Sequence, residues 1–163
     1  MTDDVSIDVA MGNAWRNVDL VRTSVQDRVT AAWASVDAGH AIAMVTAELL
    51  ENALKHGAGR AGARATLRVH GTRHHVTVSV RSPLADHDDR AASLFAALAW
   101  IDRHATPAAA HRARLMQIAS SDEEGAPSRL GLVRIAFEGN CRLAARVGGG
   151  AVTVTAALDL GAA

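Results

Sequence analysis

One ten-residue segment, residues 48–57, holds the side chains best suited to chemistry in this chain. It reads Glu-Leu-Leu-Glu-Asn-Ala-Leu-Lys-His-Gly. Helical spacing places four of its polar side chains on one face: Glu48, Asn52, Lys55 and His56. A carboxylate and an amide oxygen one turn apart are hard oxygen donors that suit Mg²⁺ or a water molecule held by it. A lysine and a histidine one turn further along can contact phosphate oxygens, so the segment predicts a magnesium and phosphate site.

An ordinary solvated helix face explains the same residues without any chemistry. The chain is rich in alanine, which favours helix almost everywhere, and a pair such as Glu51 and Lys55 stabilises an exposed helix at i, i+4 spacing. For Glu48 and Asn52 taken alone, the solvated face is the favoured interpretation. An apolar stripe that includes Leu49 runs beside the polar one, and that combination is typical of a helix lining a crevice against a sheet.

The elements that must position this helix follow from the apolar periodicity. Alternation predicts strands at residues 5–9, 66–70, 76–81, 143–147 and 152–158, and three- and four-residue spacing predicts helices at residues 14–35, 41–56, 88–104, 106–120 and 130–137. Asn13 is the expected N-cap of the first helix. Residues 37–40 are expected to form a non-helical break before the second helix, and Gly57 ends that helix.

Turn residues join these elements in a definite order. Residues 71–73 and 148–150 are short enough to close two hairpins, and Pro83 ends a strand. Thr106 and Pro107 form a helix start, and residues 139–140 a helix stop. Residues 121–127 are polar and turn-prone, which predicts a mobile lid hinged at residues 125–127.

This order predicts one domain over residues 1–163 with an α+β fold. Strands adjacent in the sequence pair antiparallel, and Thr, Arg, His and Ser at alternate strand positions indicate a solvated sheet face. We therefore expect a two-layer sandwich, in which a mixed, mostly antiparallel sheet carries its helices on one face.

Composition excludes several classes of function. The 17 acidic and 17 basic side chains balance, which argues against binding nucleic acid by phosphate neutralisation, and two Phe and three Trp with no Tyr offer few base-stacking surfaces. The single Cys141 excludes an intrachain disulfide and a cysteine zinc site. No apolar run reaches the ~20 residues of a membrane span, and the acidic start does not resemble a signal peptide. We expect a cytoplasmic protein without a membrane partner.

The 48–57 string closely resembles the N-box of the histidine-kinase-like ATPases, the GHKL or Bergerat-fold superfamily. That pattern is Glu-Leu, two variable residues, Asn-Ala, one variable residue, Lys-His or Lys-Tyr, and often Gly. The resemblance implies that Asn52 holds the Mg²⁺ that bridges the phosphates of ATP, and that Glu48 orients or activates the attacking group. It also implies that Lys55 and His56 line the nucleotide pocket. The predicted order of elements is similar to the family's order as well.

Two further landmarks of the family are altered here. Family ATPases carry an Asp at the end of the third strand, where its carboxylate accepts from the adenine amino group. This chain has Arg-Ser-Pro-Leu at residues 81–84, which leaves Ser82 as a weaker acceptor. The phosphate-binding helix opens with a glycine pair in the family, and Gly131 matches the second glycine, with Arg129 adding a charge nearby. A helix start that merely contains a glycine is the alternative for this segment.

Over its whole length the chain most resembles compact bacterial regulators, namely the anti-sigma-factor serine kinases of partner-switching systems and the SiaB-type protein kinases. The latter share the Glu-Leu-Leu-Glu-Asn-Ala string and a Gly-Leu-x-Arg-Ile-Ala-x-Glu helix, which lies here at residues 131–138.

Two functions follow as hypotheses. The first is an Mg-ATP-dependent serine/threonine kinase that acts on a small regulatory partner protein. The second is a degenerate, non-catalytic module that sequesters or tethers a signalling partner, with homodimerisation as one form. The predicted helix at residues 14–35 contains no histidine, which excludes an autophosphorylating histidine kinase.

Overall fold

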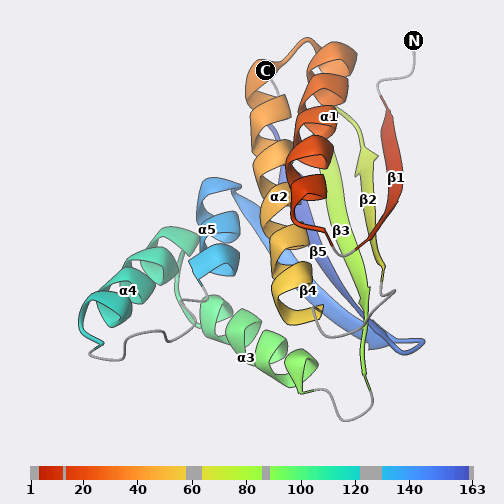
Figure 1. Cartoon of the computed structure of the whole chain (residues 1–163). Helices are drawn as coiled ribbons and strands as arrows, with labels where there is room; N and C mark the ends of the chain where they lie inside the picture. The colour runs from red at the N-terminus through yellow and green to blue at the C-terminus, as the bar shows by residue number, and fades with distance from the viewer. Residues whose placement is uncertain (1–3, 13, 58–63, 86–88, 122–129, 162–163) are drawn as a thin grey trace.

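The chain forms one five-stranded sheet covered by helices on one face (Figure 1). The computed structural model describes residues 4–12, 14–57, 64–85, 89–121 and 130–161, and the side chains of residues 56 and 57 lie outside that description. The strands are β1 (Val5–Met11), β2 (Ala65–Gly71), β3 (His75–Pro83), β4 (Cys141–Gly148) and β5 (Ala151–Asp159). The helices are α1 (Arg16–Trp33), α2 (Val36–Gly57), α3 (Arg90–Asp102), α4 (Pro107–Ala119) and α5 (Leu130–Glu138).

The sheet order is β1-β2-β3-β5-β4, and each of its four strand pairings is antiparallel. The α+β two-layer prediction is therefore confirmed, and the sheet expected to be mixed is antiparallel throughout its described strands. Both predicted hairpins are present as β2–β3 and β4–β5. Gly149 and Gly150 have φ angles of 60° and 68°, which glycine adopts without the steric cost that a Cβ brings, and this explains the tight turn between β4 and β5.

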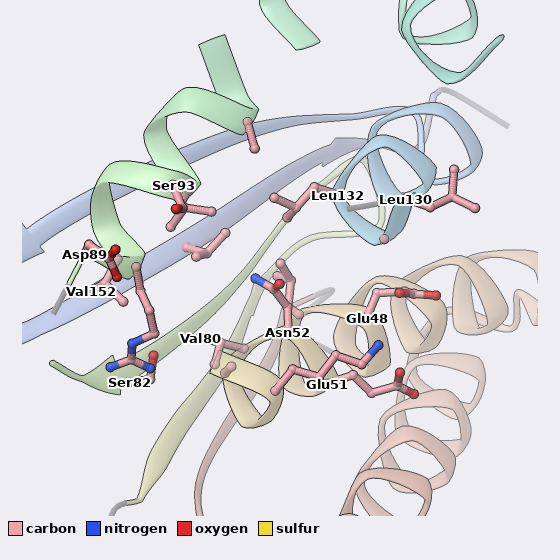
Figure 2. Close-up of a pocket in the computed structure, with 18 residues that line it drawn as sticks. Glu48, Glu51, Asn52, Val80, Ser82, Asp89, Ser93, Leu130, Leu132 and Val152 are labelled. Carbon is pink, nitrogen blue, oxygen red and sulfur yellow. The ribbon is translucent and has the colours of Figure 1, made fainter. Parts of the chain in front are cut away.

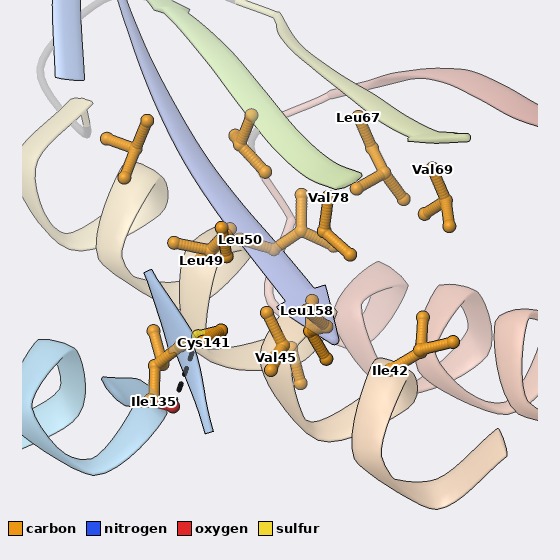
Figure 3. Close-up of a cluster of buried hydrophobic side chains, with 14 of the residues drawn as sticks. Ile42, Val45, Leu49, Leu50, Leu67, Val69, Val78, Ile135, Cys141 and Leu158 are labelled. Carbon is orange, nitrogen blue, oxygen red and sulfur yellow. Dashed lines mark hydrogen bonds between the residues drawn. The ribbon is translucent and has the colours of Figure 1, made fainter. Parts of the chain in front are cut away.

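Alternation along the strands separates a buried face from a solvated one. Val76, Val78 and Val80 of β3 are buried, whereas Thr77 and Arg81 at alternate positions are exposed. The buried face packs against the apolar stripe of α2, and Figure 3 shows Leu49 and Leu50 of that helix among the strand side chains. Fully burying one such side chain contributes about 1.5–3 kcal/mol. The core thus fixes α2 across the sheet and determines which helix face remains at the rim.

The start of α2 differs from the prediction. Residues 37–40 were expected to form a non-helical break between the first two helices, but α2 begins at Val36 and includes Gly39. A Cβ at Gly39 would overlap Thr30 Oγ1 and lie 3.0 Å from the Gln26 carbonyl oxygen, so this glycine permits close packing of α1 on α2. The break lies instead at Ala34, whose φ of 52° ends α1, and at Ser35, whose Oγ accepts from the Ala38 N–H.

The other helix boundaries agree with the prediction to within a few residues. α1 begins at Arg16 with Trp15 as its N-cap, and the expected cap, Asn13, lies outside the described residues. α4 begins as predicted, because Thr106 Oγ1 accepts from the Ala109 N–H and proline occupies the first helical position. The predicted lid at residues 121–127 falls almost wholly outside the described ranges. No helix within those ranges has the length and apolar content to cross a membrane.

Candidate functional site

A cavity of about 410 Å³ opens where α2, α3 and α5 meet the sheet (Figure 2). Its floor is apolar and comes from β3 and β5, with Val80, Val152 and Val154. Leu94 of α3 and Leu132 of α5 add apolar surface to its walls. A mostly apolar cavity with a few convergent polar groups is typical of a small-molecule site.

The polar face of α2 lines this cavity, as the spacing predicted. Glu48, Asn52 and Lys55 border it from α2, and Figure 2 labels Glu48 and Asn52 beside the first turn of α5. Two other predicted residues join them, Ser82 from the end of β3 and Gly131 from α5. The structure thus brings together five predicted residues from three elements. The side chain of His56 and the whole of Arg129 lie outside the described residues.

The Glu48 carboxylate is held between α2 and α5. Its Oε1 accepts from Arg134 Nη1 at 3.0 Å, and Arg134 Nε donates to Glu138 Oε2 at the same distance. A Cβ at Gly131 would lie only 3.0 Å from Glu48 Oε2. The absence of a side chain at Gly131 therefore makes room for this carboxylate. The phosphate-binding role of Gly131, expected from the family resemblance, stays a prediction, whereas the geometry shows that this glycine makes room for Glu48.

Burial raises the pKa of Glu48 above its ordinary value near 4.5, because loss of hydration disfavours the charged form, while Arg134 acts in the opposite direction. The Glu48 side chain is 20 % exposed, against 45 % for Arg134. A carboxylate with a raised pKa accepts a proton more readily near neutral pH than an ordinary one. Glu48 therefore combines an anchored position with proton-accepting chemistry.

The end of the cavity at α3 carries polar groups that the sequence did not identify. Asp89 lies at the N-cap position of α3 and borders the cavity, yet its side chain makes no capping hydrogen bond. Arg90 and Ser93 also line this end, and Arg90 Nη2 donates to the Pro83 carbonyl at 2.7 Å. No short-range pattern in the sequence connects α3 with the end of β3. Only the tertiary fold places them together.

The donors at the α2 end fit Mg²⁺ held jointly with phosphates. Asn52 offers an amide oxygen, and Mg²⁺ is commonly bound by one or two protein oxygens together with substrate phosphates and water. Within the described ranges, no group of three His, Cys, Asp or Glu residues could hold a metal ion by itself. An ion here would thus take most of its oxygen ligands from the nucleotide and from water.

Cys141 does not contribute to this chemistry. It is 5 % exposed, and its Sγ donates to the Ile135 carbonyl oxygen at 3.3 Å (Figure 3). Burial raises the pKa of the thiol to about 12. In this environment Cys141 acts as a small apolar side chain of the core.

No protein-family model matches this chain, and no curated protein matches it significantly.

Proposed function

We propose that this protein binds Mg-ATP in the cavity between α2, α3 and α5 and phosphorylates a serine or threonine of a small partner protein. The observation that carries the proposal is the convergence of Glu48, Asn52 and Lys55, from one helix face, with Ser82 and Gly131 around one cavity. A helix face that is only solvated is not expected to border a cavity with an apolar floor. The resemblance of residues 48–57 to the GHKL N-box supplies the ligand class, and the two-layer fold agrees with it.

The residues divide between binding and proton transfer. Asn52 would contribute its amide oxygen to Mg²⁺, and Lys55, at the exposed end of the same helix face, would neutralise phosphate charge. The bound metal supplies charge neutralisation on the phosphates. Glu48 would accept the proton of the attacking hydroxyl while that oxygen bonds to the γ-phosphorus and the bond from phosphorus to the departing ADP oxygen breaks.

The opposite end of the cavity offers hydrogen-bonding groups for the adenine base of the proposed ATP. Ser82 is 7 % exposed and lies on the core face of β3, and Asp89 at the start of α3 borders the same cavity (Figure 2). Both can accept a hydrogen bond from an amino group, and the Ser82 hydroxyl can also donate one. The aspartate missing from the end of β3 therefore does not leave this end without acceptors.

One observation favours the alternative of a non-catalytic binding module. The Glu48 carboxylate already accepts from Arg134, so it would have to leave or share that ion pair to accept a proton. A protein that only tethers a partner would keep this arrangement as a structural link between α2 and α5. The kinase proposal includes a cytoplasmic location, where ATP and Mg²⁺ are both available, and a separate partner protein as substrate.

Calorimetric titration of ATP and ADP, each with Mg²⁺, tests the proposal. We expect about micromolar binding to the unmodified protein that weakens at least tenfold in Asn52→Ala. Asn17→Ala, the same change on α1 away from the cavity, is the matched control and should bind normally. Glu48→Gln should bind Mg-ATP but lose phosphoryl transfer or ATP turnover. Binding without any turnover in the unmodified protein would favour the tethering module, and no heat at millimolar nucleotide would refute nucleotide binding.

A further inference from the structure

No described helix covers the sheet face opposite α1 and α2, and the β3-β5-β4 half of this open face is basic. Figure 1 shows α1 and α2 on one side of the sheet only. Strand register aligns Arg146 of β4, Thr153 of β5 and Arg81 of β3 in one row across this face. Arg142 lies four residues before Arg146 on β4, so both side chains project from the same face. All three arginines are exposed.

The acids described on this face are already paired elsewhere. Asp8 of β1 accepts from Arg68 of β2 at 3.0 Å, and Asp159 at the end of β5 contacts His75. Across the central row, the floor between the arginines consists of small side chains such as Thr153. Arg142 and Arg146 make no hydrogen bond or ion pair within the described structure, so their charge is available to a partner.

β4 is also an edge strand, because it is the last strand in the sheet order. The backbone groups along its outer edge can therefore pair with an added strand. Self-pairing of two β4 edges is disfavoured, since it would bring Arg142 and Arg146 of both copies together. Nucleic acid is disfavoured because no aromatic side chain lies on this face to stack on a base. The positive charge of the arginines and the unpaired backbone of the β4 edge together favour an acidic, extended polypeptide as the binding partner.

We propose that β4 and the arginine-bearing half of the open sheet face bind an extended acidic segment of a partner protein, which adds as an antiparallel strand to the β4 edge. Two carboxylates four residues apart on that segment would face Arg142 and Arg146. This inference does not depend on nucleotide binding, because the face lies on the side of the sheet opposite the cavity.

A pair of synthetic peptides of equal composition tests the geometry. In Thr-Glu-Thr-Val-Thr-Glu-Thr both glutamates project from one face of a strand, whereas in Thr-Glu-Thr-Val-Glu-Thr-Thr they project from opposite faces. Titration of the full ¹⁵N-labelled chain, followed by NMR, should show shifts along β4 and weaker binding of the second peptide. Arg142→Glu with Arg146→Glu should reduce affinity about tenfold or more, and the milder Arg→Gln pair should reduce it less.

Arg28→Glu on α1 is the control, because it makes the same change in charge at an exposed position away from the sheet face. It should leave peptide binding unchanged. The proposal is overturned if both peptides bind equally, if Arg28→Glu weakens binding as much as the β4 variants, or if β4 signals do not move at millimolar peptide. Shifts of β4 signals with protein concentration alone would assign the face to a second copy instead. Preferential binding of a single-stranded oligonucleotide to these arginines would likewise refute the acidic partner.

Discussion

Replacing Arg134 by methionine should destabilise the protein through Glu48 and not through lost packing. Methionine keeps much of the apolar stem of arginine but leaves the Glu48 carboxylate, 20 % exposed, without its ion-pair partner at 3.0 Å. Exposed pairs contribute about 0.2–1 kcal/mol, and breaking a fully buried pair costs about 3–5 kcal/mol. With one partner half-exposed and the other mostly buried, we expect a loss of about 1–2 kcal/mol at pH 7.

The sign of the pH dependence follows from Glu48. Its pKa is raised in the folded state, chiefly by burial, so the folded state binds more protons than the unfolded state and stability falls as pH rises from about 4.5 through the folded pKa. Arg134 lowers that pKa, and its removal raises the pKa further. The stability difference between the unmodified protein and Arg134→Met should therefore be greatest near neutral pH and shrink towards pH 4.5, where Glu48 becomes protonated.

Urea unfolding of a double-mutant cycle measures this effect. Glu48→Met should be nearly neutral or slightly stabilising, because a buried carboxylate is exchanged for an apolar side chain of similar size. Arg134→Met should then cost only a few tenths of a kcal/mol in the Glu48→Met background, which is the contribution of the exposed Arg134–Glu138 pair. If the cost of Arg134→Met is the same in both backgrounds, or does not change with pH, Glu48 is not the residue through which Arg134 acts.

Three further predictions concern buried residues of the core. Gly39→Ala should lower the free energy of unfolding by about 1–3 kcal/mol despite the better helix propensity of alanine, because its Cβ meets Thr30 and the backbone of α1, and Thr30→Ala should restore part of the loss in thermal unfolding. Thr46→Val should raise the free energy of urea unfolding by about 1 kcal/mol, since the buried Thr46 hydroxyl has no hydrogen-bond partner among the described residues; a decrease would show that this hydroxyl is satisfied. Cys141, with its pKa raised to about 12, should react with a thiol reagent at pH 8 only at the rate of unfolding, and rapid labelling of the native protein would contradict its burial.

Local patterns predicted most of the fold because they depend on neighbours in the sequence. Alternation located all five strands, and Thr106 with proline at the next position gave the start of α4. The start of α2 could not be obtained in this way, because Gly39 looks like a turn residue unless the close approach of Thr30 on α1 is known. In the sequence alone, a glycine in a helix and a glycine in a turn look alike, because neither the backbone angles nor the packing neighbours are visible there.

The candidate site likewise contains residues that local spacing predicts and residues that only tertiary packing brings in. Glu48, Asn52 and Lys55 lie on a single helix, so their spacing alone predicted that they would converge. Asp89 is 37 residues further along the chain than Asn52 and reaches the cavity only because α3 packs beside β4 and α5. Arg134 was visible in the sequence only as part of a helix string, and its contact with Glu48 required α5 to lie beside α2.

The charges that line the cavity bear on how the proposed nucleotide would enter it. The described lining residues include three carboxylates, Glu48, Glu51 and Asp89, and two cations, Lys55 and Arg90. A free polyphosphate would meet more negative than positive charge there, whereas Mg²⁺ lowers the charge of the phosphates and adds a ligand position for Asn52. We therefore expect ATP with Mg²⁺ to bind at least tenfold more tightly than ATP with a chelator, and Asn52→Ala to abolish that difference. Equal affinity with and without Mg²⁺ would mean that Asn52 holds no metal and that cations alone bind the phosphates.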